Sequence, residues 1–390
     1  MDIVFFVHPD FLDSQSMPRF ARMLEAGMAG RGHTISSWTA KPRFFRLPFP
    51  KSIKKWMGYI DQFIIFPLEV KRRLKNRTGN TIFVFTDHAL GPWVPLVAKF
   101  PHVIHCHDFL AQRSGLGEIP ENMSSWTGRQ YQNFIRRGYS KGKNFISVSE
   151  KTRDELHRFM GFLPHCSEMV YNGLNQSFQP NNPQVAGELL SKKFNIDLSD
   201  GFILHVGGNQ WYKNRLGLIE IYNSWRLISK LNLPLLLIGD QPSAELVSAH
   251  TESKFKPDIH FISGVEDENV RLAYSAAAVF IFPSLAEGFG WPIAEAMASG
   301  CPVITTNEAP MTEVSGNAGF QIDRRPGNAE SVMNWAAESA KLVEMVLTLS
   351  PADRGSVIER GLLNVKRFDS KTALDQVEII YKNVLQTYRN

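Results

Sequence analysis

The chain has 390 residues, of which 43% are apolar and 21% charged, and its formal net charge is +5. This length favours two domains over one, and the ordinary composition argues against a disordered or fibrous protein. The three cysteines are widely spaced and form no CxxC pair, so they indicate a reducing compartment and no disulfide framework or metal site.

Apolar runs alternate with helical periodicity in the first half of the chain. Residues 3–7, 81–85, 102–106 and 144–149 are predicted to be buried parallel strands, and residues 18–30 a helix that ends at a glycine. No apolar run approaches the roughly 18 residues that cross a bilayer, and the amino terminus resembles a core strand rather than a signal peptide. We therefore expect a cytoplasmic protein.

Residues 41–77 concentrate the positive charge, with eleven Lys and Arg against Asp61 and Glu69. Aromatic residues among cations can stack on nucleic-acid bases, but no other motif supports nucleic-acid binding. Contact with an anionic membrane, at the inner face of the plasma membrane, is the interpretation that we favour. A solvated face packed on its own domain is the ordinary alternative.

The alternation restarts after residue 200, with predicted strands at 202–208, 233–239, 259–264, 279–284 and 302–306 and helices between them. Residues 178–201, rich in Pro, Asn, Gly and Asp, are the predicted linker. The fold class is therefore α/β, with two doubly wound parallel sheets in tandem. A last amphipathic helix is predicted at 371–386.

The stretch EGFGWPIAE places two carboxylates, Glu287 and Glu295, around two glycines. Pro292 is suited to the first turn of a helix and Gly300 to its end, so Glu287 lies on a loop after a strand and Glu295 about one turn into a helix. Parallel sheets bind ligands at this strand-to-helix edge. Ordinary helix-dipole chemistry and the acid and base of a glycoside hydrolase are alternatives at this point.

The longer stretch IFPSLAEGFGWPIAEAMASGCPVIT resembles the signature of the retaining family 4 glycosyltransferases, whose E-x7-E motif corresponds to Glu287 and Glu295. Shorter motifs in matching order extend the resemblance over most of the chain. It implies the GT-B fold, with two Rossmann-like domains facing a central cleft. Residues 1–185 would bind the acceptor and 186–370 the donor, and a final helix within 371–390 would cross back to the first domain.

The resemblance assigns roles to matching residues. It implies that Glu295 holds the ribose of the nucleotide, that Glu287 holds the transferred sugar, and that Lys213 binds the diphosphate. His107 would lie near the donor sugar, without serving as general base. The expected catalytic residues are Lys213, Glu287 and His107, and the expected donor-binding residues are Gly208, Asn209, Val265, Gly288, Phe289, Gly290, Trp291 and Glu295.

Two departures from the family pattern affect this assignment. Many relatives have an arginine where this chain has Asn209, so phosphate binding would shift onto Lys213 and backbone amides. Arg215 is near in sequence, but its position in a helix does not by itself aim it at a phosphate. Residues 8–20, HPDFLDSQSMPRF, replace a common Gly-Gly turn beside the reaction centre.

The implied reaction moves a hexose from a nucleotide diphosphate sugar to a hydroxyl of a glycan or lipid-linked acceptor, with retention at the anomeric carbon. Surface polysaccharide or glycolipid synthesis is the expected setting. No cofactor is expected beyond the co-substrate, and no DxD pair suggests a metal. A nucleotide-sugar epimerase, a phosphorylase or a non-catalytic nucleotide-sugar binding protein of the same fold are alternatives, whereas a nicotinamide dehydrogenase would need a GxGxxG that is missing after the first strand.

Overall fold

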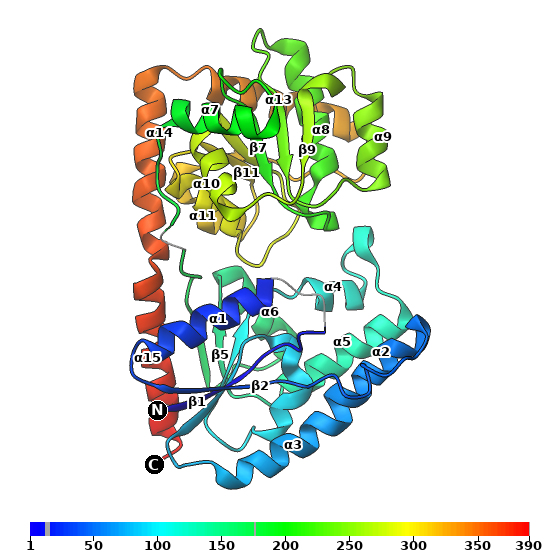
Figure 1. Ribbon diagram of the computed structural model, residues 1–390, viewed down its shortest axis with the longest axis vertical. Coiled ribbons are helices and arrows are strands. Elements are labelled where there is room, and N and C mark those ends of the chain that lie inside the picture. The colour runs from blue at the N-terminus through cyan, green and yellow to red at the C-terminus, as the bar shows by residue number, and fades with distance from the viewer. Residues whose placement is uncertain (12–15, 175–176, 390) are drawn as a thin grey trace. The chain divides into compact units, whose positions relative to one another are not determined.

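The computed structural model describes residues 1–11, 16–174 and 177–389. Its internal contacts divide the chain into two units, Met1–Tyr171 with Lys371–Asn390, and Asn172–Ser370. Each unit is a six-stranded parallel sheet with helices on both faces, in agreement with the predicted doubly wound α/β class (Figure 1).

The first sheet has the strand order β2-β1-β3-β4-β5-β6. Because the chain places β2 on one side of β1 and β3 on the other, the topology reverses between β1 and β3. The four inner strands are almost completely buried, which explains why the sequence predicts them. The strands are β1 (Asp2–Phe6), β2 (Thr34–Trp38), β3 (Thr81–Phe85), β4 (His102–Cys106), β5 (Asn144–Ser147) and β6 (Cys166–Met169).

Successive side chains of these strands point to opposite faces, and each face has its own apolar core. One face is covered by α1 (Ser16–Ala29) and α15 (Ser370–Thr387). The other is covered by α3 (Phe66–Arg73), α5 (Trp126–Tyr139) and α6 (Glu150–Met160) (Figure 1). The sheet is therefore buried on both sides, which requires the near-continuous apolar runs seen in its sequence.

The last helix, α15, packs on the first sheet. The hydroxyl of Tyr381 lies 2.7 Å from Nε2 of His105, and Nε of Arg31 donates to Asp375 at 3.1 Å. Burial lowers the pKa of His105 to about 3, so its ring is neutral. His105 is thus a core residue.

The second sheet has the order β12-β11-β10-β7-β8-β9, so its topology reverses between β7 and β10. Helices α8 (Arg215–Ile228), α9 (Ala244–Glu252) and α13 (Ala329–Leu347) pack on one of its faces. The strands are β7 (Ile203–Val206), β8 (Leu235–Ile238), β9 (Ile259–Ile262), β10 (Val279–Phe282), β11 (Val303–Thr306) and β12 (Phe320–Ile322).

The boundary between the units differs from the predicted one. The first unit ends at Tyr171 rather than residue 185, and the predicted linker, residues 178–201, contains a helix of the second unit. That helix, α7, has Pro183 in its first turn and its N-cap on Asn182, so the Pro and Asn that suggested a linker start a helix.

No helix of the described residues is long and apolar enough to span a membrane. The remaining helices are α2 (Lys51–Ile60), α4 (Leu110–Leu116), α7 (Pro183–Phe194), α10 (Asp267–Ala276), α11 (Trp291–Ala298), α12 (Met311–Ser315) and α14 (Pro351–Asn364).

Candidate functional site

An ion pair stands where the second sheet reverses its topology. Lys213 follows β7 and Glu287 follows β10, and Nζ of Lys213 donates to Oε1 of Glu287 at 2.8 Å. The two side chains are 13% and 10% exposed, so both are largely shielded from water yet remain reachable. Parallel sheets bind ligands at such a reversal, which makes this pair the centre of the candidate site.

Backbone and side-chain bonds between the loops after β7 and β10 fix this geometry. Lys213 ends a 3-10 turn, and Asn214, in the left-handed conformation at φ 52°, caps α8. The side chain of Asn214 donates to the carbonyl of Pro283 at 2.9 Å, and Leu285 N–H donates to the Tyr212 carbonyl at 2.7 Å. Lys213 and Glu287 therefore meet because their loops are tied together.

The loop after Glu287 leads into α11 through Gly290, whose φ of 103° is one that side chains disfavour. Gly290 is the N-cap, so the first amides of α11 point out of its amino end. Phe289 is buried against Phe368, and Trp291 begins the helix. Gly288 is half-buried between Glu287 and Phe289.

Glu295 lies one turn into α11, as its position after Pro292 predicts. Its exposed fraction is 7%. Its Oε2 accepts a hydrogen bond of 3.2 Å from the hydroxyl of Tyr274 on α10. Glu287 lies on the loop that follows β10, whereas Glu295 lies in α11. The two carboxylates therefore belong to different elements.

Asn209 is engaged by the neighbouring loop. Its N–H donates to Oδ2 of Asp240 at 3.0 Å, and its side-chain amide donates to the carbonyl of Gln241. Gly208 leaves the room for this contact, since a Cβ there would lie 2.5 Å from the Asp240 carboxylate. The loops after β7 and β8 are thus joined through Asn209.

Arg215, in the first turn of α8, reaches back to the same loops. Its Nη1 donates to Oδ1 of Asn209 and, at 3.0 Å, to the carbonyl of Asp240. The side chain is buried, and its Nε and Nη2 have no hydrogen-bond partner within the described part of the chain. The sequence left the direction of Arg215 undecided, and the tertiary contacts aim its guanidinium at the strand ends.

Two predicted site residues make none of these contacts. Val265 is half-buried on the loop after the edge strand β9. His107 belongs to the first unit, where it follows β4, and its Nε2 donates to the carbonyl of Thr86 at 2.8 Å. Burial lowers the pKa of His107, which favours the neutral ring with Nδ1 as its acceptor.

A second pair at the reversal of the first sheet was missed by the sequence analysis. His8 follows β1 and Asp87 follows β3, and Nε2 of His8 lies 2.9 Å from Oδ2 of Asp87. Nδ1 of His88 lies 3.0 Å from the other oxygen. Burial alone would raise the pKa of Asp87, but the two histidines outweigh it and hold the pKa well below its usual value. The available signal was that His8 and Asp87 each come just after a buried strand.

Residues 12–15 of the first loop, which replaces the usual Gly-Gly turn, lie outside the described residues. Over the described ranges, no group of three or more His, Cys, Asp and Glu could hold a metal ion.

Comparison with known proteins gives two family matches and several relatives. Residues 17–178 match the model for Glycosyltransferase Family 4, and residues 188–344 match the one for Glycosyl transferases group 1. The chain is 26% identical to the O-antigen chain mannosyltransferase B of Escherichia coli, over 65% of this chain and 64% of that protein. It is 29% identical to the capsular polysaccharide biosynthesis glycosyltransferase CapM of Staphylococcus aureus, over 55% of this chain and 54% of CapM. These matches span less than two thirds of either relative.

A solved structure has the same architecture over nearly the whole chain. HepE of Anabaena, crystallised with UDP and glucose, superposes with a TM-score of 0.68 at 16% identity, over 97% of this chain and 98% of HepE. At that identity the similarity shows the fold alone. The two family matches, the related mannosyltransferases and the two parallel sheets together show that the chain belongs to the family 4 glycosyltransferases and has the GT-B fold.

Proposed function

We propose that the protein is a retaining, metal-independent glycosyltransferase that moves a hexose from a nucleotide diphosphate sugar to a hydroxyl of a glycan or lipid-linked acceptor. The observation that carries the proposal is the Lys213–Glu287 pair at the reversal of the second sheet. Relatives that build O-antigen and capsular polysaccharide support surface polysaccharide synthesis as the setting.

In this proposal Lys213 and Glu287 contact different parts of the same donor molecule. Lys213 pairs with the diphosphate, and Glu287 accepts hydrogen bonds from hydroxyls of the transferred sugar. The amides at the start of α11 add partial positive charge near the phosphates. Glu295 holds the ribose hydroxyls while Tyr274 orients its carboxylate. Arg215 holds the Asn209 loop in place, so that Lys213 and backbone amides bind the phosphates without the arginine common in relatives.

The reaction follows from these contacts. The acceptor oxygen attacks the anomeric carbon from the face that the diphosphate leaves, so a carbon–oxygen bond forms as the one to the diphosphate breaks. The acceptor proton passes to an oxygen of the departing diphosphate, and the configuration at the anomeric carbon is retained. Negative charge grows on the diphosphate, and Lys213 stabilises it more in the transition state than in the ground state.

Thermal unfolding with UDP, GDP, ADP and their sugars tests donor binding, because a ligand of the folded state raises the unfolding temperature. We expect one nucleotide class to stabilise the wild type and Lys213→Ala to abolish that shift. The anomeric configuration of the product, followed by NMR with an α-linked donor, then tests retention. Donor binding without hydrolysis or transfer would favour a non-catalytic binding protein.

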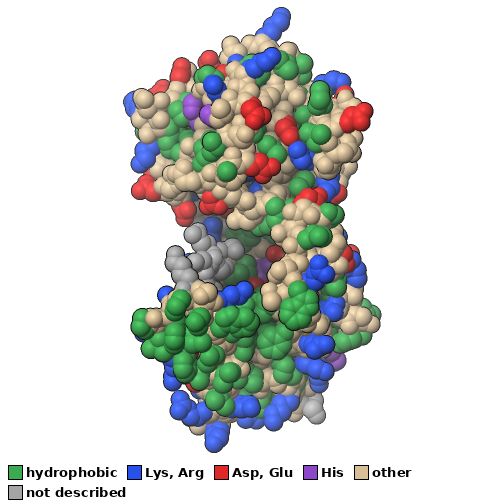
Figure 2. Space-filling view, turned by 90° about the vertical axis from the view of Figure 1, so that its right-hand side faces the viewer, with side chains coloured by type: hydrophobic (Ala, Val, Ile, Leu, Met, Phe, Trp, Pro, Cys, Tyr) green, Lys and Arg blue, Asp and Glu red, His purple; other side chains and the backbone are tan. Residues whose placement is uncertain are grey.

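We further propose that residues 41–77 contact an anionic membrane surface at the inner face of the plasma membrane. Apolar side chains in this segment face solvent, with Trp56 59% and Leu68 60% exposed. Figure 2 shows hydrophobic side chains gathered on one face of the first unit, with Lys and Arg side chains along its border. Apolar anchors together with cations are the combination that binds peripheral proteins to anionic lipid.

Vesicle binding tests the membrane contact. Trp56→Ser with Leu68→Ser is expected to weaken binding to anionic vesicles at least about tenfold, and added salt to weaken it further. Met333→Ser, which removes an apolar side chain 76% exposed in the second unit, is the control. Equal binding to neutral and anionic vesicles would contradict the proposal.

A further inference from the structure

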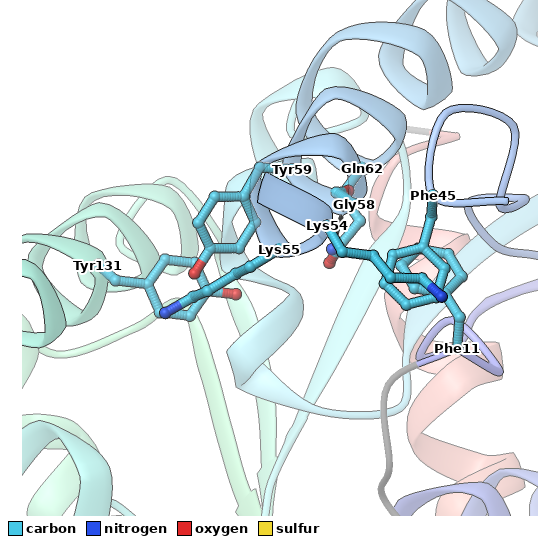
Figure 3. A pocket seen from close by; sticks show the side chains of 8 residues that line it. All are labelled: Phe11, Phe45, Lys54, Lys55, Gly58, Tyr59, Gln62 and Tyr131. Carbon is cyan, nitrogen blue, oxygen red and sulfur yellow. Dashed lines mark hydrogen bonds between the residues drawn. The ribbon is translucent and has the colours of Figure 1, made fainter. Parts of the chain in front are cut away.

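The first unit contains a pocket of about 490 Å³ that none of the predicted site residues lines. It lies between the loop before α2, the helix α2 itself and α5 (Figure 3). Aromatic rings, two lysines and one amide make up its wall. The lining residues are Phe11, Phe45, Lys54, Lys55, Gly58, Tyr59, Gln62 and Tyr131.

The rings form two stacked pairs on opposite sides of the pocket (Figure 3). The centroids of Phe11 and Phe45 are 4.7 Å apart, and those of Tyr59 and Tyr131 are 5.6 Å apart, with interplanar angles of 28° and 20°. Burial raises the pKa of Tyr131 to about 12, so its hydroxyl remains protonated and can donate a hydrogen bond. The pocket thus offers flat apolar faces together with hydroxyl groups.

Each side of the pocket also has an ammonium group. Nζ of Lys54 lies 4.8 Å from the ring centroid of Phe45, and Nζ of Lys55 lies 5.7 Å from that of Tyr59. The ion pairs with Glu69 among the described residues of this segment involve Arg43 and Arg73, and neither involves Lys54 or Lys55. Two cations held over rings, with no acid to neutralise them, favour an anionic ligand.

Contacts within the chain hold the lining residues of the pocket in position. The buried carboxylate of Asp61 accepts the N–H groups of Phe44 and Phe45 at 3.0 and 2.9 Å, which fixes the loop that carries Phe45. Gly58 lets the rings approach, since a Cβ there would lie 3.3 Å from both Phe11 and Phe45. The helix widens into a π-helical turn over Asp61–Ile65, an irregularity that is frequent at functional sites.

We propose that this pocket binds a phosphate-bearing sugar of the acceptor, an inference that rests on the proposed function. The apolar C–H face of a sugar ring packs on the aromatic pairs, and the phosphate or diphosphate attached to it pairs with Lys54 and Lys55. The same helix exposes Ile53 and Trp56, so a sugar carried on a lipid diphosphate would reach the pocket from the membrane surface. A free sugar phosphate shares this chemistry.

Titration calorimetry on the full chain tests the proposal without requiring turnover. The probes are glucose 1-phosphate, a short-chain prenyl diphosphate sugar and neutral methyl glucoside. We expect both anionic probes to bind and Lys54→Ala with Lys55→Ala to weaken them at least about tenfold. Tyr131→Ala is expected to weaken both through lost packing. Lys99→Ala is the matched control, because Nζ of Lys99 lies 5.3 Å from the ring of Phe100 outside the pocket.

The outcomes separate this proposal from the proposed function. Tighter binding of the prenyl diphosphate sugar would support a lipid-linked acceptor, and equal binding of the two anionic probes would support a free sugar phosphate. Wild-type affinity in the double lysine variant, or equal binding of methyl glucoside, would overturn the pocket assignment even if the protein transfers sugars. Circular dichroism of each variant checks folding. If the protein binds these probes but no nucleotide sugar, the proposed function is contradicted and the pocket assignment is not.

Discussion

The two sheets reverse their strand order at equivalent places, yet they hold different chemistry there. In the second sheet the pair is Lys213 and Glu287, joined at 2.8 Å, and in the first it is His8 and Asp87, at 2.9 Å. The same topology therefore presents an ammonium–carboxylate pair in one unit and an imidazole–carboxylate pair in the other.

The surroundings sharpen the contrast. Beside Lys213 are the amino end of α11 and the buried guanidinium of Arg215, both of which favour an anion. Beside Asp87 are His8 and His88, which use the carboxylate as their partner. The second edge fits the diphosphate of the proposed donor, whereas at the first edge an ionised carboxylate is held between two imidazoles. Four predictions test this division.

The largest effect is expected at the second edge. Lys213→Ala and Glu287→Gln should each lower kcat/KM for sugar transfer by roughly 100-fold or more, because each removes a charged side chain that contacts the donor in the proposed site. Steady-state kinetics measure this. Lys341→Ala, which breaks an exposed ion pair with Glu338 on α13, is the control and should leave kcat/KM unchanged. Near wild-type rates for both site variants would place the site elsewhere.

At the first edge, Asp87→Asn is expected to lower stability. The free energy of unfolding of the variant should be about 2 kcal/mol below that of the wild type near neutral pH, with donor affinity unchanged. Because the folded-state pKa of Asp87 lies below the usual 3.8, its contribution is present above that value and is lost as the pH falls toward the folded pKa. The gap to wild type should therefore shrink below about pH 4.

Urea unfolding followed by circular dichroism at about pH 5, 4 and 3 measures that gap. Asp10→Asn, at an exposed position of the same unit, is the control. A gap that widens in acid would reverse the sign expected for Asp87.

An intermediate effect is expected from Arg215→Met. The substitution keeps the apolar stem but frees the loops that carry Asn209 and Asp240, so KM for the donor should rise about tenfold with a smaller change in kcat. Arg226→Met, at the other end of α8, is the control and should leave the donor KM unchanged. An equal fall in kcat and kcat/KM would instead make Arg215 a direct partner of the transition state.

The smallest effect is expected from Tyr274→Phe, which removes only the hydroxyl that donates to Glu295. Donor affinity measured by calorimetry should fall by roughly two- to tenfold, the effect of one hydrogen bond. Tyr222→Phe, whose hydroxyl donates to a backbone carbonyl in the core of the same unit, is the control. No change in Tyr274→Phe would remove the orienting role of this hydroxyl.

How much the sequence predicts depends on where a strand lies in its sheet. The central strands are buried on both faces and appear as apolar runs, so β3 and β4 were predicted with their bounds. The edge strand β2 has the sequence TISSW and is largely exposed, and β6 is only half-buried, so neither has the expected pattern. Edge strands are stabilised by pairing with a neighbour, which local sequence does not reveal.

The same division holds for the site. By itself the sequence determined the fold class, the position of Glu287 on a strand-to-helix loop and that of Glu295 in the following helix, because these depend on local periodicity and on glycine and proline. Only the tertiary structure decided that Lys213 meets Glu287, that Arg215 turns back to Asn209, and that His8 pairs with Asp87. The Lys213–Glu287 and His8–Asp87 contacts, and the bond from Arg215 to the Asp240 carbonyl, each join loops from different strands. Strand order is set by packing of the whole sheet rather than by any one segment.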